Sequence, residues 1–282
     1  MLSPVPGVRL RGVNSTNVRS VLRRRSFLLL ILPVLLVAVP QVQADRAPAS
    51  AEIEAATVAV PLTLTPQMRL WVHDAVPVEG TIESRLRRLS RALLDTNEFQ
   101  LTENPDYTGT ASEVFRSRRA NCVGYSMLFV GLAREIGIST YFITFDRARQ
   151  VSKRGNLSVA ADHMAAAYGE GDRLLVFDLA GVARTTARKV RRLGDPAASA
   201  IFYSNAGVEL LLGDKARAAV DHLEIAVWLD PTMADGWSNL GVAFRRTGSR
   251  HEAREAYRRA LELNPGSETT RTNLMVLQGR PD

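Results

Sequence analysis

The last third of the chain repeats itself with a period of 34 residues. Such a period marks a supersecondary unit that buries its apolar face only by stacking on its neighbours. The small residue pairs Gly207 with Ala226 and Gly241 with Ala260 let two helices of one unit approach closely. The period predicts helical hairpins at 200–233 and 234–267. The recurring positions are Tyr203, Asn205, Gly207, Ala219, Leu223, Ala226 and Pro231, which return as Trp237, Asn239, Gly241, Ala253, Tyr257, Ala260 and Pro265.

The length and residue types of this unit are those of the tetratricopeptide repeat (TPR). Asn273 and Leu274 continue the register, which predicts a capping helix at 268–278 and an array over 200–282. Two repeats and a cap fall short of the roughly three that an independent array needs. We therefore expect the array to pack against the preceding domain, with Ile201 and Phe202 in or near the interface. The resemblance implies a concave surface for a protein or peptide partner, and a purely structural brace is the alternative.

The chain has a single cysteine, Cys122, at the start of a predicted helix that is apolar on most of its surface and ends at Gly137. A lone cysteine excludes an internal disulfide framework and a cysteine-based metal site. The free N–H groups and positive dipole end of a helix start stabilise a thiolate, and three arginines just upstream would act in the same direction. The alternative is a small buried apolar residue, as free cysteines usually are.

Local signals predict the elements around this helix. Apolar spacing predicts a helix over Thr81–Asp95, and Thr110 with Glu113 has the form of a capping box. A strand at 138–145 and a basic loop at 146–156 follow. Strands at 157–168 and 173–179 would flank a turn at 169–172, which predicts a hairpin.

The register of this hairpin brings two polar residues together. If the turn is centred between Glu170 and Gly171, cross-strand partners have numbers that sum to 341, and His163 faces Asp178. Their Cβ atoms would lie about 4.5–5.5 Å apart. The carboxylate would orient the imidazole, which would take the proton of the Cys122 thiol. Alternatively, both are ordinary strand residues, and Asp162 is a rival carboxylate on the opposite sheet face.

These residues resemble the core of the transglutaminase-like superfamily over roughly residues 80–185. The resemblance implies a papain-like α+β arrangement, with a helix that carries Cys122 packed on an antiparallel sheet that carries His163 and Asp178. Two positions depart from the family pattern: Ala120 stands where glycine is frequent, and Ala165 where an aromatic residue is frequent. The resemblance is carried by Arg118–Tyr125, Leu128–Ile138, His163 and Val176–Asp178.

The first 44 residues have the pattern of a secretory signal peptide. A basic stretch that ends at Arg25 precedes the apolar run Phe27–Val39 and the small-residue site Val42–Ala44. The run is too short for the roughly 20 residues of a membrane span, so we expect cleavage and no stable span afterwards, with an uncleaved anchor as the alternative. Ordinary and twin-arginine export both fit. Because only 3 of the 36 basic residues are lysines, we expect a bacterial protein in the periplasm.

The sequence thus predicts a signal peptide (1–44), a linker (45–65), a cysteine domain (66–195) and the TPR array. Removing the signal segment leaves 30 basic against 29 acidic residues, so the net charge of +7 indicates no nucleic-acid partner. We expect no cofactor and no metal; the oligomeric state stays open.

The signal-peptide pattern and the resemblance together imply an exported thiol-dependent acyl-transfer enzyme, either a peptidase or amidase or a transglutaminase-like enzyme. In it Cys122 attacks a carbonyl, His163 acts as base and then acid, and Asp178 orients His163. The backbone N–H of Cys122 would contribute to the oxyanion hole. The alternative is a non-catalytic transglutaminase-like scaffold that serves as a TPR adaptor in the cell envelope, which the departures at Ala120 and Ala165 favour.

Overall fold

A computed structural model describes residues 60–145, 150–154, 157–161, 163–179, 181–184 and 190–279, which all belong to one unit of the chain, 47–282. The predicted signal peptide, most of the predicted linker and Asp162 lie outside the described residues. Within the part of the chain that is described, no helix is long and apolar enough to cross a membrane.

The helices before the sheet begin where the sequence supplies caps. Helix α2 (Ile82–Leu94) begins after Thr81, whose side chain accepts a hydrogen bond from the Ser84 N–H. Helix α3 (Ala111–Ser117) has the predicted capping box, and α4 (Cys122–Glu135) ends at the predicted site, with Gly137 at a φ of +80°. Helix α1 (Pro66–Ala75) was not predicted, although Thr65 caps it and a proline opens it.

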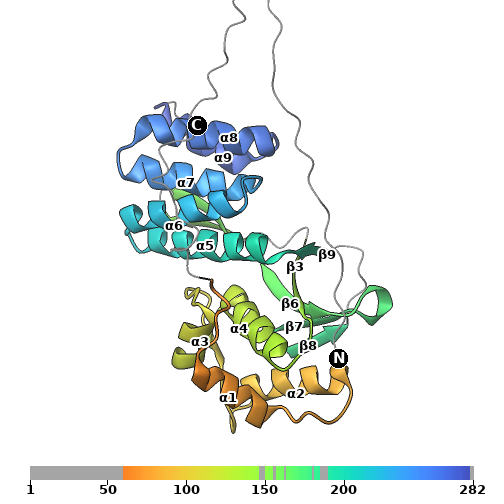
Figure 1. The fold of residues 1–282 in the computed structure, drawn as a ribbon. Coiled ribbons are helices and arrows are strands. Elements are labelled where there is room, and N and C mark those ends of the chain that lie inside the picture. The colour runs from red at the N-terminus through yellow and green to blue at the C-terminus, as the bar shows by residue number, and fades with distance from the viewer. Residues whose placement is uncertain are drawn as a thin grey trace, which may run out of the picture. The chain divides into compact units, whose positions relative to one another are not determined.

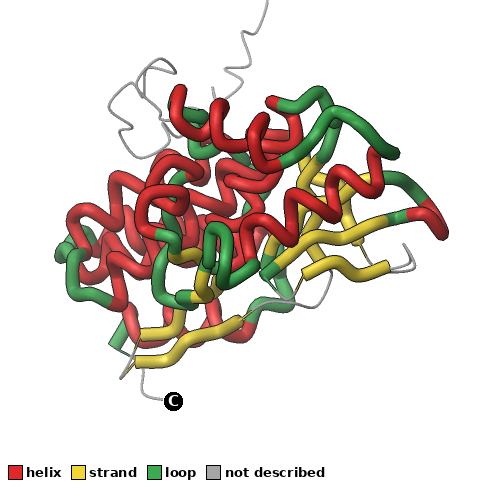
Figure 2. Tube along the Cα trace, turned by 90° about the horizontal axis from the view of Figure 1, so that it is seen from below, coloured by secondary structure: helices red, strands yellow, loops and turns green. Residues whose placement is uncertain are grey.

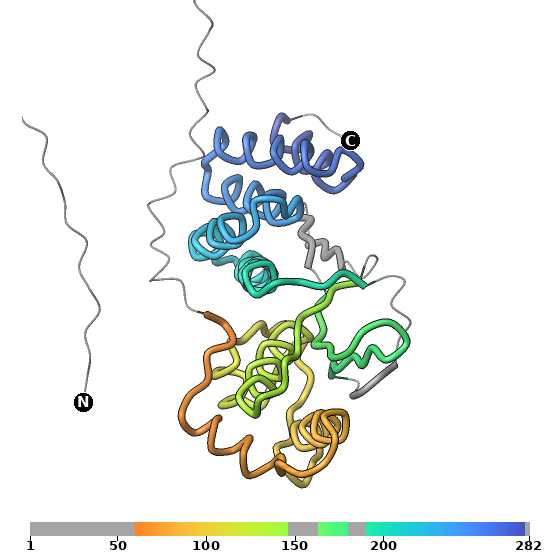
Figure 3. The backbone as a smooth tube through the Cα atoms, turned by 45° about the vertical axis from the view of Figure 1, so that its right-hand side comes forward, coloured from red at the N-terminus to blue at the C-terminus, as the bar shows by residue number. Residues whose placement is uncertain are grey.

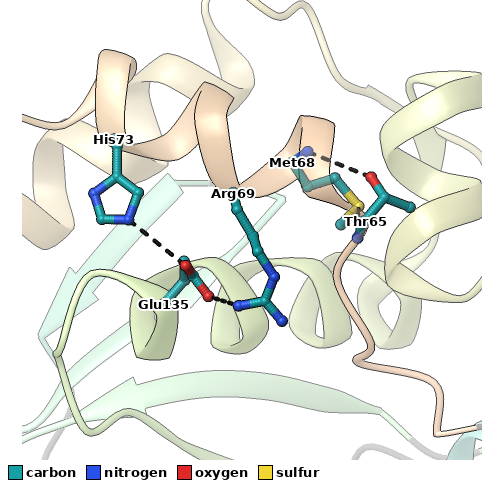
Figure 4. A network of polar contacts seen from close by, with 5 residues as sticks. All are labelled: Thr65, Met68, Arg69, His73 and Glu135. Carbon is teal, nitrogen blue, oxygen red and sulfur yellow. Dashed lines mark hydrogen bonds and ion pairs between the residues drawn. The ribbon is translucent and has the colours of Figure 1, made fainter.

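Helix α1 is tied to the far end of α4 by polar contacts (Figure 4). Arg69 pairs with Glu135, and His73 Nε2 lies 3.6 Å from the same carboxylate. At the start of α1, the Met68 N–H donates to the Thr65 hydroxyl at 3.3 Å. The carboxylate at the end of α4 therefore holds α1 in place from one side.

One antiparallel sheet follows α4, with the strand order β8-β7-β6-β3-β9 (Figure 1). Two smaller sheets accompany it: a parallel pair of β1 with β2, and an antiparallel ribbon of β4 with β5 that contacts helices of the C-terminal array. The strands are β1 (Thr102–Glu103), β2 (Arg119–Ala120), β3 (Tyr141–Phe145), β4 (Gln150–Arg154), β5 (Leu157–Ala161), β6 (Met164–Tyr168), β7 (Leu175–Asp178), β8 (Gly181–Arg184) and β9 (Val190–Leu193).

The predicted hairpin is corrected in two respects. The single strand expected at 157–168 is two strands in different sheets, β5 and β6, and His163 stands directly before β6; the basic loop expected at 146–156 contains β4. The β6–β7 register pairs Ala166 with Phe177, so partner numbers sum to 343 and not to 341. The reason is the longer connection, which includes a 3₁₀ turn at Gly171–Arg173. A shift of two residues preserves the sheet face, so His163 and Asp178 are diagonal neighbours instead of direct partners.

Helix α4 lies between the sheet and the helices α1 and α2, as Figure 3 shows. Its surface is apolar almost all round, so it packs against elements on several sides. The Phe129 ring stacks on Phe177 of β7 with 4.6 Å between the ring centroids. The sheet and the helices that cover it are distinguished by colour in Figure 2. The α+β prediction is confirmed, and the cysteine helix is the centre of this core.

The C-terminal third is an array of helical hairpins, also as predicted. The helices of each repeat approach closely at the glycines, as predicted: a Cβ on Gly207 would lie 2.6 Å from Leu223, and one on Gly241 the same distance from Tyr257. Ile201 and Phe202 belong to the same buried cluster as α4. The helices are α5 (Asp195–Leu212), α6 (Ala216–Leu229), α7 (Ala234–Arg246), α8 (Arg250–Leu263) and α9 (Glu268–Leu277).

Candidate active site

Cys122 is the first residue of α4 and is partly buried. The helix begins here because Asn121 is its N-cap: the Asn121 side-chain oxygen accepts a hydrogen bond from the Gly124 N–H at 2.9 Å. The sulfur accepts a hydrogen bond from the backbone N–H of Met164, and the N–H groups of Cys122 and Val123 at the start of the helix also favour its thiolate form. The thiol is therefore held between the start of α4 and the start of β6.

Burial raises the pKa of the Cys122 thiol above its ordinary value. The three backbone N–H groups lower this pKa, and the charge of Glu103 raises it further; burial is the largest of these effects. The sequence predicted that the upstream arginines would help to ionise the thiol. Of these, Arg118 instead places its guanidinium over the Phe99 ring, 5.1 Å from the ring centroid. The resting cysteine is accordingly a neutral thiol at pH 7.

His163 is fixed through its backbone and one ring face. The Thr144 hydroxyl donates a hydrogen bond to the His163 carbonyl at 2.8 Å. The Phe145 ring packs against the imidazole, with 5.5 Å between the centroids and an angle of 38°. Strand β3, the neighbour of β6 in the sheet, thus supplies both contacts.

Burial lowers the pKa of the His163 imidazole, and the negative charge of Asp178 acts in the opposite direction. Asp178 is the last residue of β7, and its charge also raises the pKa of Tyr125 on α4, although burial is the larger cause there. At pH 7 the imidazole is neutral. It is thus in the protonation state that a general base requires.

The structure places Cys122 beside the backbone of the residue that follows His163, and places His163 within reach of the charge of Asp178. The sulfur of Cys122 bonds to the N–H of Met164, the residue directly after His163, and the charge of Asp178 acts on His163. Sequence reasoning missed Met164, whose contribution is a backbone group that no residue type reveals. It also missed Ser126, whose buried hydroxyl donates to the carbonyl oxygens of Cys122 at 2.7 Å and Met164 at 3.3 Å.

Among the described residues, no group of three or more His, Cys, Asp or Glu side chains is arranged to hold a metal ion. The start of α4 and the adjoining sheet supply a thiol (Cys122), an imidazole (His163), a carboxylate (Asp178) and backbone donors. These are the groups that nucleophilic acyl transfer uses.

Comparison with known families decides the identity of both parts. Residues 73–178 match the transglutaminase-like superfamily, and residues 234–267 match a tetratricopeptide repeat. The chain carries a transglutaminase-like domain followed by a TPR repeat. The matched range of the transglutaminase-like domain includes Cys122 and His163 and ends at Asp178.

Two curated proteins that resemble this chain are named for their tetratricopeptide repeats. The chain is 25% identical over 177 residues to a chloroplastic tetratricopeptide repeat domain-containing protein of Arabidopsis thaliana, covering 56% of this chain and 54% of that protein. It is 37% identical over 101 residues to a TPR repeat-containing protein of Pseudomonas aeruginosa, covering 31% of this chain and 41% of that protein. The chain therefore spans about half or less of each relative's length.

Two solved TPR domains also resemble part of the chain. The second TPR domain of human RPAP3, in complex with an HSP70 peptide, is 24% identical with a TM-score of 0.28 and covers 28% of this chain and 67% of that chain. The Sgt2 TPR domain from Aspergillus fumigatus is 27% identical with a TM-score of 0.28 and covers 28% of this chain and 54% of that chain.

The two departures from the family pattern are both buried in the transglutaminase-like domain. Ala120 belongs to β2, directly before the N-cap of α4, and Ala165 pairs with Ile143 of β3. Both side chains are fully buried. Neither position therefore presents a side chain to solvent beside the thiol.

Proposed function

We propose that this protein is an exported thiol-dependent acyl-transfer enzyme. One observation carries the proposal: the N–H of the residue that follows His163 bonds to the sulfur of Cys122, while the charge of Asp178 acts on the His163 imidazole. A nucleophile, a base beside it and a third group that orients the base are the parts of a catalytic triad.

In the proposed reaction, the Cys122 thiol proton passes to neutral His163 as the sulfur attacks a carbonyl carbon. The N–H of Cys122 donates to the oxygen that becomes negative. His163 then returns the proton to the leaving group, and a thioester to Cys122 remains. Water or an amine resolves this thioester, with His163 again acting as base. A neutral Cys122 thiol beside a neutral His163 imidazole suits this order of steps, because the proton moves to His163 as the sulfur attacks.

The test uses the single cysteine as its own reporter. Iodoacetamide alkylation of Cys122, followed by intact mass between pH 6 and 10, gives a rate for each variant. We expect His163→Ala to slow alkylation at pH 7 by about tenfold or more, because general-base assistance is lost. His251→Ala, which changes an exposed histidine on α8, is the matched control and should react like the wild type.

A second readout follows the acyl group itself. With p-nitrophenyl acetate, the wild type should form an acetyl adduct that Cys122→Ala lacks and that His163→Ala forms more slowly. If His163→Ala matched the wild type in both assays, the acyl-transfer proposal would be refuted.

That outcome would favour the second candidate function, a non-catalytic adaptor. The observation behind it is the burial that raises the pKa of the Cys122 thiol, since buried structural cysteines are inert. In this function the transglutaminase-like domain is a scaffold, and the TPR array binds a protein or peptide partner. Both curated relatives are named for their TPR repeats, which supports a protein-interaction role for the array.

Export is part of the proposal and rests on residues 1–44, with their basic stretch, apolar run and small-residue site. Expression in a bacterial host should yield periplasmic protein whose intact mass is that of a chain beginning at Asp45. Ala44→Arg should block the cleavage, because the site requires a small residue. Recovery of the wild type in the cytoplasm with its full N-terminus would contradict export.

A further inference from the structure

The first helix of the TPR array reaches the start of the cysteine helix through one carboxylate. Glu209 on α5 accepts a hydrogen bond from the Thr108 N–H at 2.9 Å and another from the Thr108 hydroxyl. Its Oε1 also lies 3.4 Å from Nδ2 of Asn121. Asn121 immediately precedes Cys122 in the chain. An array side chain therefore contacts the residue next to the proposed nucleophile.

Asn121 carries this contact into α4 because both ends of its amide are engaged. Its Nδ2 donates to the Thr108 hydroxyl oxygen at 2.6 Å, and its Oδ1 accepts from the Gly124 N–H at 2.9 Å. Its own N–H donates to the Tyr107 carbonyl at 3.2 Å. With these bonds made, the amide has one orientation, in which the oxygen caps the helix.

The carboxylate sets the direction of this chain of bonds. An ionised Glu209 only accepts, so the Thr108 hydroxyl must donate to it and keeps its lone pairs for Asn121. Thr108 and Asn121 are each 8% exposed, so the bonds form with little competition from water. Burial raises the pKa of Glu209, and its two bonds from Thr108 lower it. Glu209 also lines a cavity of about 490 Å³ between Tyr107 and the first repeat.

We propose that Glu209 is a positioning residue for the Cys122 thiol. It fixes the Asn121 amide, and Asn121 fixes the first turn of α4, where the N–H groups of Cys122 and Val123 favour the thiolate. The TPR array is then a part of the active-site unit and not only a docking module. This inference rests on the proposed role of Cys122 as the nucleophile.

The test compares Glu209→Ala and Glu209→Gln with Glu262→Gln, an exposed glutamate of α8, in the full chain. The alkylation rate of Cys122 with iodoacetamide is measured against pH at 25 °C, beside the thermal midpoint of each variant. We expect Glu209→Ala to raise the pH at the inflection of the alkylation profile by about half a unit. The alkylation rate at pH 7 should then be about threefold lower than in the wild type. Glu209→Gln keeps an oxygen for the Thr108 hydroxyl and should give a smaller shift.

A structural role alone would lower the thermal midpoint and leave the inflection in place, which would overturn the inference. Asn121→Ala should give the same upward shift, and the double variant with Glu209→Ala should add nothing to it, because both act through one chain of bonds. Additive shifts would also overturn it. This test can fail independently of the test of the proposed function. A normal alkylation rate in His163→Ala refutes acyl transfer, whereas an unchanged inflection in Glu209→Ala refutes only the positioning role of Glu209.

Discussion

A close helix contact inside the second repeat gives a stability prediction that the structure quantifies. Gly241 lies on α7, and a Cβ atom built there would be 2.6 Å from both Cδ1 and Cε1 of Tyr257 on α8. Non-bonded carbon atoms prefer about 3.5–4.0 Å. The ring would have to retreat by about 1 Å, yet it is fully buried. Gly241→Ala should therefore destabilise the array.

Two opposing effects set the magnitude. Alanine in a helix interior is favoured over glycine by about 1 kcal/mol, whereas overpacking a core costs about 1–3 kcal/mol. Because the obstacle is a buried aromatic ring, we expect the upper half of this range and a net loss of about 1–2 kcal/mol. Gly236→Ala on the same helix is the matched control. There the nearest atom is Met233 Sδ at 3.0 Å, on a flexible side chain that can move. The gain in helix propensity and the cost of overpacking should therefore nearly cancel.

The assay is urea unfolding of the full chain, followed by the helical circular dichroism signal. The midpoint for Gly241→Ala should fall clearly below those of the wild type and Gly236→Ala. Equal midpoints for the two variants, or a Gly241→Ala variant more stable than the wild type, would refute the reasoning from the close contact.

Three further expectations concern the domain that carries the cysteine. Asp178→Asn removes a charge that raises the pKa of His163, so the histidine midpoint measured by NMR should move to lower pH; an upward move would contradict the assignment. The pKa of His163 in the folded protein is below its unfolded value of about 6.5. As the pH falls, the imidazole is therefore protonated first in the unfolded chain, and the free energy of unfolding should decrease as the pH drops below about 6.5. Denaturation of His163→Gln from pH 7 to pH 5 should show a smaller fall than that of the wild type. Arg134→Ala breaks a two-bond pair with Asp195 at 2.7 and 2.9 Å that joins α4 to α5. Since both side chains are partly exposed, urea unfolding should show a loss of about 1 kcal/mol, and an unchanged midpoint would show that the pair contributes nothing.

Much of the local structure followed from short-range patterns. Thr81 and Thr110 cap helices because a hydroxyl can satisfy a free N–H three residues on, and this depends only on neighbours in the chain. The apolar helix that begins at Cys122 and the helices of the repeat array were predictable for the same reason.

The register of β6 with β7 was not predictable, because it depends on the shape of the connection. A 3₁₀ turn lengthens the hairpin loop and moves Asp178 from a position opposite His163 to a diagonal one. The side-chain period of two keeps both positions on the same face after a shift of two residues, so the proposed pairing of His163 with Asp178 stays a prediction.

The sequence by itself determined most of the segments that form helices and named the candidate site residues, because residue type and periodicity act locally. Only the tertiary structure decided how the thiol is held. Burial outweighs the helix start and raises the pKa of Cys122, and the N–H of Met164 comes from a strand 42 residues further along the chain. Glu209 meets Thr108 and Asn121 only after α5 has packed beside α4, since contacts between distant segments depend on how whole elements pack.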